Sequence, residues 1–523
     1  MPLHHVRFNA RFGLLILAAA IPTACTLARH NSQINPHRLP NILIILADDL
    51  GYSDVACYNA EAKNLTPNID RLAAQGMLFT DAHSPSTVCT PTRYSLLTGR
   101  MAFRTEFRGV FTSPGGASLI EEDRLTIGQM LRDKGYVTAC IGKWHVGMTF
   151  LDDQGQPIYD AGVDAVQRID FSRPIPDGPI HRGFDRFFGT ACCPTTDWLY
   201  AYIDQDHIPV PPTRQFDRST LPDHPYARDC RAGMIAPDFV MDMVDMRFLE
   251  ESKAFLREHV HRRPDVPFFL FHSMQAVHQP SLVAPQFQGK SGMGPHGDFI
   301  MQMDWTVGEL LATLDELGVA DNTLVIFASD NGPEVSVVVN MRRDYGHDGA
   351  HPWRGMKRDQ WEGGHRVPFI VRWPGRVPSG SRSDQLLSLT DLMATFAAIV
   401  DAQLPNNAAE DSYNMLPVLL GEQSDEPVRP YMLQQTNSLA LSIRSGRWKY
   451  LDHRDSGGNR YDVEPLVQYT LPEVAPDAPG QLYDLETDPG ETRNLYFERP
   501  EIVTKLRSLL QASVTSGRST PQR

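Results

Sequence analysis

The sequence is poor in cysteine and in net positive charge, and each shortage excludes a class of protein. Seven cysteines among 523 residues are too few for a disulfide scaffold of this size, and none has the C-x-x-C spacing of a zinc site. The formal net charge of −14 argues against nonspecific nucleic-acid binding, so we expect no nucleic-acid partner. A content of 41% hydrophobic and 21% charged residues is typical of a globular protein and excludes a disordered chain.

Long apolar runs are also scarce, and the one near the start is too short to cross a membrane, which takes about 20 residues. Basic residues precede this run at 13–21, and small residues follow it, which predicts an export signal over residues 1–28. Cleavage after Ala24 would leave Cys25 first, as in a bacterial lipoprotein, although Pro22 stands where such signals usually carry leucine. We therefore expect an exported protein without a transmembrane segment. Periplasmic, secreted and lipid-anchored locations remain alternatives.

Short apolar runs recur along the chain, and four of them lead to polar residues. The four pairs are 42–46 with Asp48 and Asp49, 137–141 with Lys143 and His145, 267–271 with His278, and 323–327 with Asp330 and Asn331. Continuous runs of this length fit strands buried on both faces of a parallel sheet. Helical patterns alternate with them, which predicts an α/β sandwich. Ligands bind beyond the carboxyl ends of such strands, so we expect the polar residues to converge on one edge.

The character of the chain changes beyond about residue 405. Residues 405–411 are linker-like, and 439–451 has the pattern of a β-hairpin. Apolar spacing after Pro500 predicts a final amphipathic helix. We therefore predict a catalytic domain over 38–405 and a smaller C-terminal α+β subdomain over 406–515, built from an antiparallel sheet and a helix.

The segment Cys89-Thr90-Pro91-Thr92-Arg93 reads C-x-P-x-R, and Thr98-Gly99-Arg100 follows it. The short pattern arises easily by chance, but the extension makes it more specific. The whole resembles the signature of the type I, formylglycine-dependent sulfatases, which are arylsulfatase-like members of the alkaline-phosphatase superfamily. Further segments resemble motifs of that family, although Val277 replaces the family's usual proline. They are Gly142–Gly147, Ala276–Pro280, Arg354–Gly364 with Lys357, and the C-terminal element Gln481–Glu491.

Four acidic or amide residues predict a metal site. Asp48, Asp49, Asp330 and Asn331 offer only oxygen ligands, which suit a hard cation such as Ca²⁺ or Mg²⁺. Either pair alone is more often a turn or a helix cap. Their position at strand ends beside a candidate nucleophile favours the metal. The resemblance implies one calcium ion that modified Cys89 also contacts, while the residues themselves leave magnesium open.

The resemblance also implies the fold and the reaction: an alkaline-phosphatase-like α/β/α core that hydrolyses sulfate monoesters. In that family a formylglycine-generating enzyme oxidises the cysteine, here Cys89, to an aldehyde whose hydrate is the nucleophile. Lys143, Lys357 and the cation would stabilise the anionic ester oxygens. His278 would protonate the leaving alcohol, and His145 would assist expulsion of sulfate. Arg93 would hold the hydrate.

The substrate is predicted to be a sulfated carbohydrate, with other sulfate esters as the wider class. The variable loops are expected within 150–235, where Trp198, Tyr200 and Tyr202 would stack on sugar rings or simply pack. Two alternatives remain. One is a phosphonate or phosphate monoester hydrolase of the same fold, and the other is a non-catalytic secreted sulfoglycan-binding protein.

The remaining cysteines suggest packing roles. Cys140 lies in an apolar strand-like run, where we expect an inert core thiol. Cys192 and Cys193 are adjacent and would point apart in an extended segment, and a disulfide to Cys230 remains open.

Overall fold

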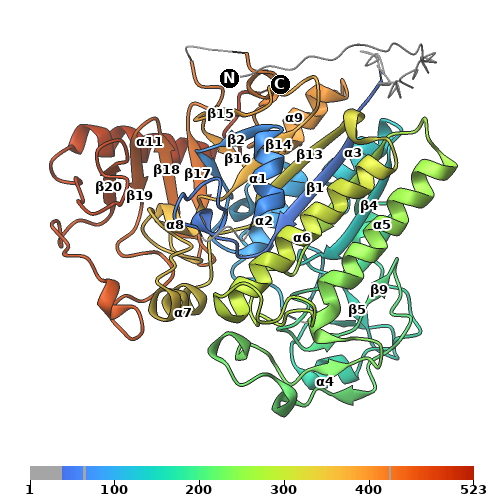
Figure 1. Ribbon diagram of the computed structural model, residues 1–523. Helices are drawn as coiled ribbons and strands as arrows, with labels where there is room; N and C mark the ends of the chain where they lie inside the picture. The colour runs from blue at the N-terminus through green and yellow to red at the C-terminus, as the bar shows by residue number, and fades with distance from the viewer. Residues whose placement is uncertain (1–37, 63–65, 113, 423–425, 523) are drawn as a thin grey trace, which may run out of the picture. The chain divides into compact units, whose positions relative to one another are not determined.

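The computed structural model describes residues 38–62, 66–112, 114–422 and 426–522 (Figure 1). The predicted export signal over residues 1–28 lies outside these ranges. None of the helices within the described ranges combines the length and the apolar character that a membrane crossing requires.

A nine-stranded mixed sheet forms the centre of the described chain, in the order β15-β2-β14-β13-β1-β12-β4-β7-β9. Its middle strands β13, β1, β12, β4 and β7 run parallel. The bounds are β1 Asn41–Ala47, β2 Met77–Phe79, β4 Val137–Lys143, β7 Arg186–Thr190, β9 Ile203–Asp204, β12 Phe268–Ser273, β13 Thr323–Ser329, β14 Phe369–Arg372 and β15 Ser381–Ser383. The four apolar runs of the sequence are thus confirmed as neighbouring parallel strands.

Helices cover both faces of this sheet, which confirms the predicted α/β/α sandwich (Figure 1). One layer contains α1 Pro67–Ala74, α5 Val244–Arg262 and α6 Gly294–Glu316, and the other contains α2 Cys89–Thr98, α3 Ile127–Asp133 and α9 Leu392–Ile399. Because both faces are covered, every residue of β1, β12 and β13 is buried. Burial on both faces explains why the sequences of these three strands are almost continuously apolar.

A second sheet lies near the C-terminus and is antiparallel. It contains β17 Met432–Gln435, β18 Leu441–Ser445, β19 Trp448–Leu451 and β20 Gln481–Asp484. The predicted hairpin is β18–β19, and the predicted last helix is α11 Pro500–Thr515, which packs on this sheet around a small core of its own. From Leu39 onwards the chain nevertheless forms one compact unit, so the subdomain boundary at residue 405 stays a prediction.

The described chain also contains several shorter strands and further helices. They are β3 Ala82–His83, β5 Phe150–Leu151, β6 Pro157–Ile158, β8 Leu199–Tyr200, β10 Arg214–Gln215, β11 Met234–Ile235, β16 Leu387–Ser388, α4 Val163–Gln167, α7 Val335–Tyr345, α8 Glu362–His365 and α10 Leu416–Leu419.

Candidate active site

Cys89 is the first residue of α2 and is 2% exposed. Pro91 fits the first turn of this helix, because the amide hydrogen that proline lacks would have no partner within the helix. The thiol lies at a cavity of about 200 Å³ that His145, His278 and Lys357 also line. A hydrogen bond with the Cys193 thiol, aided by the nearby positive charge of Lys143, holds the pKa of Cys89 well below its usual value despite burial.

The acidic residues come together because β1 and β13 are adjacent and parallel. Asp48 and Asp49 follow β1, and Asp330 and Asn331 follow β13. The Asp49 amide donates to Asp330 Oδ1 over 3.3 Å, and Asn331 Nδ2 donates to Asp49 Oδ1 over 2.7 Å. All four side chains are buried. Two segments about 280 residues apart thus build one oxygen-rich cluster.

This cluster fits a hard cation. Asp48 Oδ1 and Asn331 Oδ1 are buried and have no hydrogen-bond partner within the described ranges. One ligand atom from each of Asp48, Cys89 and Asp330 lies within 4.8 Å of the others. Unpartnered buried oxygens are costly, and an ion would coordinate both.

Electrostatics support the same interpretation. Burial and the Asp48 carboxylate raise the pKa of Asp330 well above its ordinary value. Burial would also raise the pKa of Asp48, but Lys143 and other nearby cationic groups hold it below its ordinary value. The two carboxylates therefore repel one another, and added positive charge between them would keep both ionised.

Three basic side chains surround the acidic cluster. Lys143 Nζ donates to Asp48, and Lys357 Nζ donates to Asp49 Oδ2 over 2.8 Å. Arg93, one turn after Cys89, lies 2.8 Å from Asp330 through Nη2. All three are buried, so their charges lie in a site with little water to screen them.

Each of the two site histidines has a backbone carbonyl that fixes its ring. His145 Nε2 lies 2.8 Å from the Phe111 carbonyl, and His278 Nδ1 lies 2.5 Å from the Gln279 carbonyl. A carbonyl only accepts, so these nitrogens carry hydrogen. His145 therefore presents Nδ1 to the cavity, and His278 presents Nε2, which lies 3.6 Å from Asp49 Oδ2.

Local backbone geometry explains part of the sequence around these residues. Gly142 has a φ of 116°, and a Cβ there would lie 1.8 Å from the Ser273 carbonyl oxygen, so only glycine fits between β4 and β12. Asp49 and His145 have φ values of 59° and 61°, which are uncommon for residues other than glycine. Such conformations cluster at functional sites.

The structure thus brings together every site residue that the sequence singled out. It also adds residues that the sequence did not single out: the Cys193 sulfur lies 3.9 Å from a ring nitrogen of His145 and of His278, and Glu334 Oε2 lies 3.6 Å from Lys357 Nζ. Cys193 follows β7, a strand that carries Arg186 and Gly189 and so lacks the continuous apolar pattern of its neighbours. If the sequence had identified β7 as a strand, Cys193 would have been expected at the site, because ligands bind beyond the carboxyl ends of parallel strands.

The structure corrects the interpretation of the loop aromatics. Tyr200 is 0% exposed and Tyr202 is 6% exposed, so neither can stack on a sugar. The Tyr200 hydroxyl donates to the Arg231 carbonyl over 2.8 Å, and Tyr202 stacks on Phe188. Both were predicted as sugar contacts, and the packing alternative holds because the loops fold over an apolar core.

The structure also shows the state of the other cysteines. Every cysteine in the described ranges is a free thiol, so the bridge to Cys230 does not form. Instead the Cys230 sulfur lies 3.4 Å from the Tyr200 hydroxyl. Cys140 is fully buried in β4, as expected, and burial raises the pKa of its thiol.

Comparison with known proteins gives a consistent result. A family profile described as Sulfatase matches residues 40–402. The chain is 34% identical to an N-acetylgalactosamine-6-O-sulfatase of Bacteroides thetaiotaomicron, over 96% of this chain and 98% of that protein. It is 32% identical to Arylsulfatase A of Homo sapiens, over 92% and 90% of the two chains.

Solved structures agree with these sequence matches. A sulfatase structure from a study of glycosaminoglycan metabolism by Bacteroides thetaiotaomicron superposes with a TM-score of 0.75 at 32% identity, covering 91% of this chain and 100% of that one. The fold, the family profile and the relatives together establish that this chain belongs to the sulfatase family and is a sulfuric ester hydrolase.

Proposed function

We propose that the protein removes sulfate from a sulfated carbohydrate, with a formylglycine made from Cys89 and one bound calcium ion. The observation that carries the proposal is the pair of unpartnered buried oxygens, Asp48 Oδ1 and Asn331 Oδ1, beside the Cys89 thiol. A binding protein would gain nothing from such an arrangement, because it needs neither a nucleophile nor a metal beside it.

The calcium ion would be held by Asp48, Asp49, Asp330 and Asn331 together with residue 89, and it would supply fixed positive charge. Magnesium remains the alternative. In the thiol form, Cys89 Sγ stands in for the oxygens of the hydrated aldehyde. That hydrate supplies the nucleophile and, through its second hydroxyl, a route to release sulfate.

The side chains around residue 89 would carry the remaining steps. Lys143 and Lys357 would bind the non-bridging oxygens of the ester, whose negative charge needs preorganised positive partners. His278 Nε2 would give its proton to the leaving alcohol, because its other nitrogen is held by the Gln279 carbonyl. His145 Nδ1 would accept a proton from the hydroxyl at residue 89. Arg93 would hold the same residue and the Asp330 carboxylate.

The choice of a carbohydrate rests on three supports. A relative at 34% identity is named an N-acetylgalactosamine-6-O-sulfatase. Asp197 and Arg231 line the cavity as an ion pair of 2.7 Å, and such groups can hydrogen-bond sugar hydroxyls. The predicted export signal would bring the enzyme to extracellular glycans, either free or lipid-anchored through Cys25.

A comparison of two expression hosts tests the proposal. Protein made with a formylglycine-generating enzyme should carry an aldehyde at residue 89, shown by peptide mass and by an aldehyde probe, and should hydrolyse 6-sulfated N-acetylgalactosamine. Protein made without that enzyme, and a Cys89→Ser variant, should lack both. Full activity with an unmodified thiol would exclude the mechanism. Faster hydrolysis of the matching phosphate ester would favour the phosphatase alternative.

A further inference from the structure

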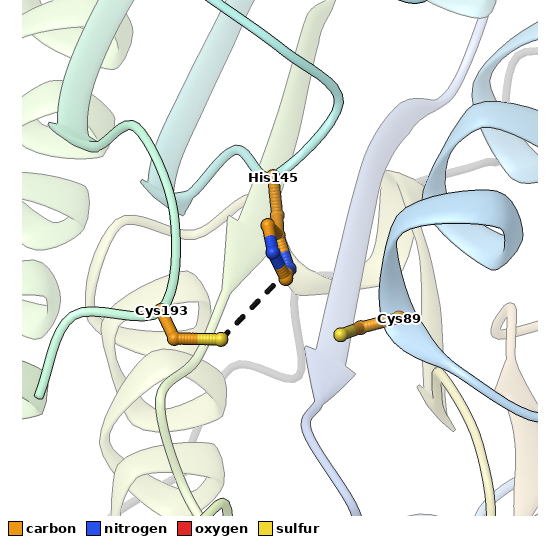
Figure 2. A group of neighbouring side chains, drawn as sticks. All are labelled: Cys89, His145 and Cys193. Carbon is orange, nitrogen blue, oxygen red and sulfur yellow. Dashed lines mark hydrogen bonds between the residues drawn. The ribbon is translucent and has the colours of Figure 1, made fainter. Parts of the chain in front are cut away.

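Cys193 brings a second sulfur atom to the site, and the sulfatase reaction described above does not use it. Figure 2 shows Cys89, His145 and Cys193 pointing toward one another from three different segments. Their ligand atoms all lie within 4.8 Å of one another, and all three side chains are buried. The Cys193 sulfur is 3.9 Å from His145 Nδ1 and 3.9 Å from His278 Nε2. Two sulfurs and two imidazole nitrogens therefore converge on one side of the cavity.

The separations between the Cys193 sulfur and the two histidine nitrogens are close to what a tetrahedral metal requires, and the Cys89 sulfur lies within 4.8 Å of Cys193 and of His145. Zn–S bonds of about 2.3 Å and Zn–N bonds of about 2.0–2.1 Å put neighbouring donors roughly 3.5–3.8 Å apart. The observed separations of 3.9 Å exceed this by only a few tenths of an ångström, which small side-chain rotations can close.

The histidines are also oriented as metal ligands usually are. A ligating histidine commonly donates its other ring N–H to a carbonyl, which fixes the tautomer and aims the free nitrogen at the metal. His145 does so to Phe111, and His278 does so to Gln279. Both free nitrogens consequently face the sulfur atoms.

We propose that the protein with an unmodified Cys89 thiol binds a thiophilic divalent cation of the Zn²⁺ class through Cys89, Cys193 and His145, with His278 in reach as a fourth ligand. The two thiols release their protons to solvent, and the two thiolates balance the charge of the ion. This site shares residue 89 with the proposed calcium site, whose other ligands would be oxygens of Asp48, Asp49, Asp330 and Asn331. Oxidation of Cys89 to formylglycine replaces one sulfur ligand by oxygen and leaves Cys193 as the single sulfur ligand, which weakens the site for a thiophilic cation.

The open cavity gives an ion a route to these ligands. The same cavity of about 200 Å³ is lined by Cys89, Cys193, His145 and His278. Its volume exceeds that of a single ion, so binding needs no opening of the core. The thiol form and the aldehyde form of one chain thus differ in the metal that they hold as well as in activity.

Metal titration of the thiol form tests this inference. The protein is made in a host without the modifying enzyme, its thiol at residue 89 is verified by peptide mass, and a phosphine reductant prevents a Cys89–Cys193 disulfide. With saturating Ca²⁺ present, added Co²⁺ should give the intense thiolate-to-cobalt charge-transfer absorption, and one equivalent of Zn²⁺ should abolish it.

Single substitutions identify the ligands. Cys193→Ser should weaken Zn²⁺ binding on the order of 100-fold or more, since loss of even an outer partner costs roughly 10–100-fold. His145→Gln should also weaken Zn²⁺ binding. Cys57→Ser is the matched control, because Cys57 is outside the cavity, and its binding should equal that of wild type. Thermal melting confirms that each variant is folded.

Three results would overturn the inference: wild type without thiolate absorption, folded Cys193→Ser protein with undiminished Zn²⁺ affinity, or Zn²⁺ displaced by Ca²⁺. The last would place zinc among the oxygen ligands. The sulfatase proposal is judged separately, by hydrolysis with the aldehyde form, which should show no thiolate absorption from residue 89.

Discussion

Arg93 and Asp330 form a fully buried ion pair that joins helix α2, which begins at Cys89, to the segment that follows strand β13. The Arg93 Nη2 atom lies 2.8 Å from Asp330 Oδ2, and Nε donates to the same oxygen over 3.0 Å. The third nitrogen, Nη1, donates to the Lys143 carbonyl over 3.1 Å. One guanidinium therefore ties α2 to β4 and to the residue that follows β13, and its loss should affect stability as well as catalysis.

We expect Arg93→Ala to lower the free energy of unfolding by about 3–5 kcal/mol, because Asp330 would be left buried without its partner. Arg93→Lys keeps the charge but not the planar fork, so it should recover part of this stability and little activity. Urea unfolding and hydrolysis of an aryl sulfate measure the two effects. Wild-type stability in Arg93→Ala would contradict the assigned role of the ion pair.

Removal of the proposed calcium ion should destabilise the wild-type protein, because the carboxylates of Asp48 and Asp330 would then repel one another without compensation. A chelator should lower its melting temperature and abolish activity, and added Ca²⁺ should restore both. In Asp330→Asn, which should be inactive, the same chelator should shift the melting temperature much less. Equal shifts in the two proteins would count against a metal at this site.

His278→Gln should affect substrates according to their leaving groups. A sugar alcohol is a poor leaving group and needs a proton, so its release should slow by about 10²–10⁴-fold. A nitrophenolate leaves readily without a proton, so hydrolysis of nitrophenyl sulfate should fall far less. The ratio of the two kcat/KM values reports the role directly. A uniform loss for both substrates would instead assign His278 to binding or to the metal.

Because Tyr200 and Tyr202 are buried, we expect Arg231 to contribute to substrate specificity in their place. Arg231 lines the cavity, and its guanidinium lies 5.6 Å from the Trp198 ring. Arg231→Ala should therefore weaken hydrolysis of a sulfated oligosaccharide and leave a small aryl sulfate nearly unchanged. Tyr200→Phe, the control, removes the buried hydroxyl that bonds to the Arg231 carbonyl and to the Cys230 sulfur, and it should lower the free energy of unfolding by about 1 kcal/mol without this discrimination. Equal losses on both substrates in Arg231→Ala would contradict the assignment.

Stability should fall in mild acid through His272. Burial lowers the pKa of this histidine from 6.5 to about 3, so it stays neutral in the folded protein while the unfolded chain takes up a proton. Its contribution is therefore complete above the unfolded pKa and is lost as the pH falls from 6.5 toward 3. Between about pH 7 and pH 5 the loss is about 2 kcal/mol.

Urea unfolding at both pH values tests this expectation on His272→Asn, which cannot titrate there. The substitution also removes the contact of 2.8 Å between His272 Nδ1 and the Ser252 hydroxyl, which lowers stability equally at both pH values. The test compares the change in the free energy of unfolding between the two pH values. In the variant this change should be smaller than in wild type by about 2 kcal/mol. An unchanged pH dependence would exclude His272 as its source.

The sequence determined the sandwich and most of the chemical groups at the site. The strands β1, β4, β12 and β13 are continuous apolar runs because both faces of a parallel sheet are buried, and this pattern is local. The polar residues after these strands were identifiable because carboxyl ends of parallel strands share an edge. Motif resemblance then supplied the expected role of Cys89.

The tertiary structure decided which groups meet and which side chains are available. Cys193 lies near His145 because it follows strand β7. The arginine and glycine of β7 interrupt its apolar pattern, so the sequence did not identify it as a strand. Tyr200 is of a residue type that often stacks on sugars, but the surrounding loops bury its side chain completely. Burial and distance depend on segments far apart in the chain that pack together, so residue type alone does not specify them.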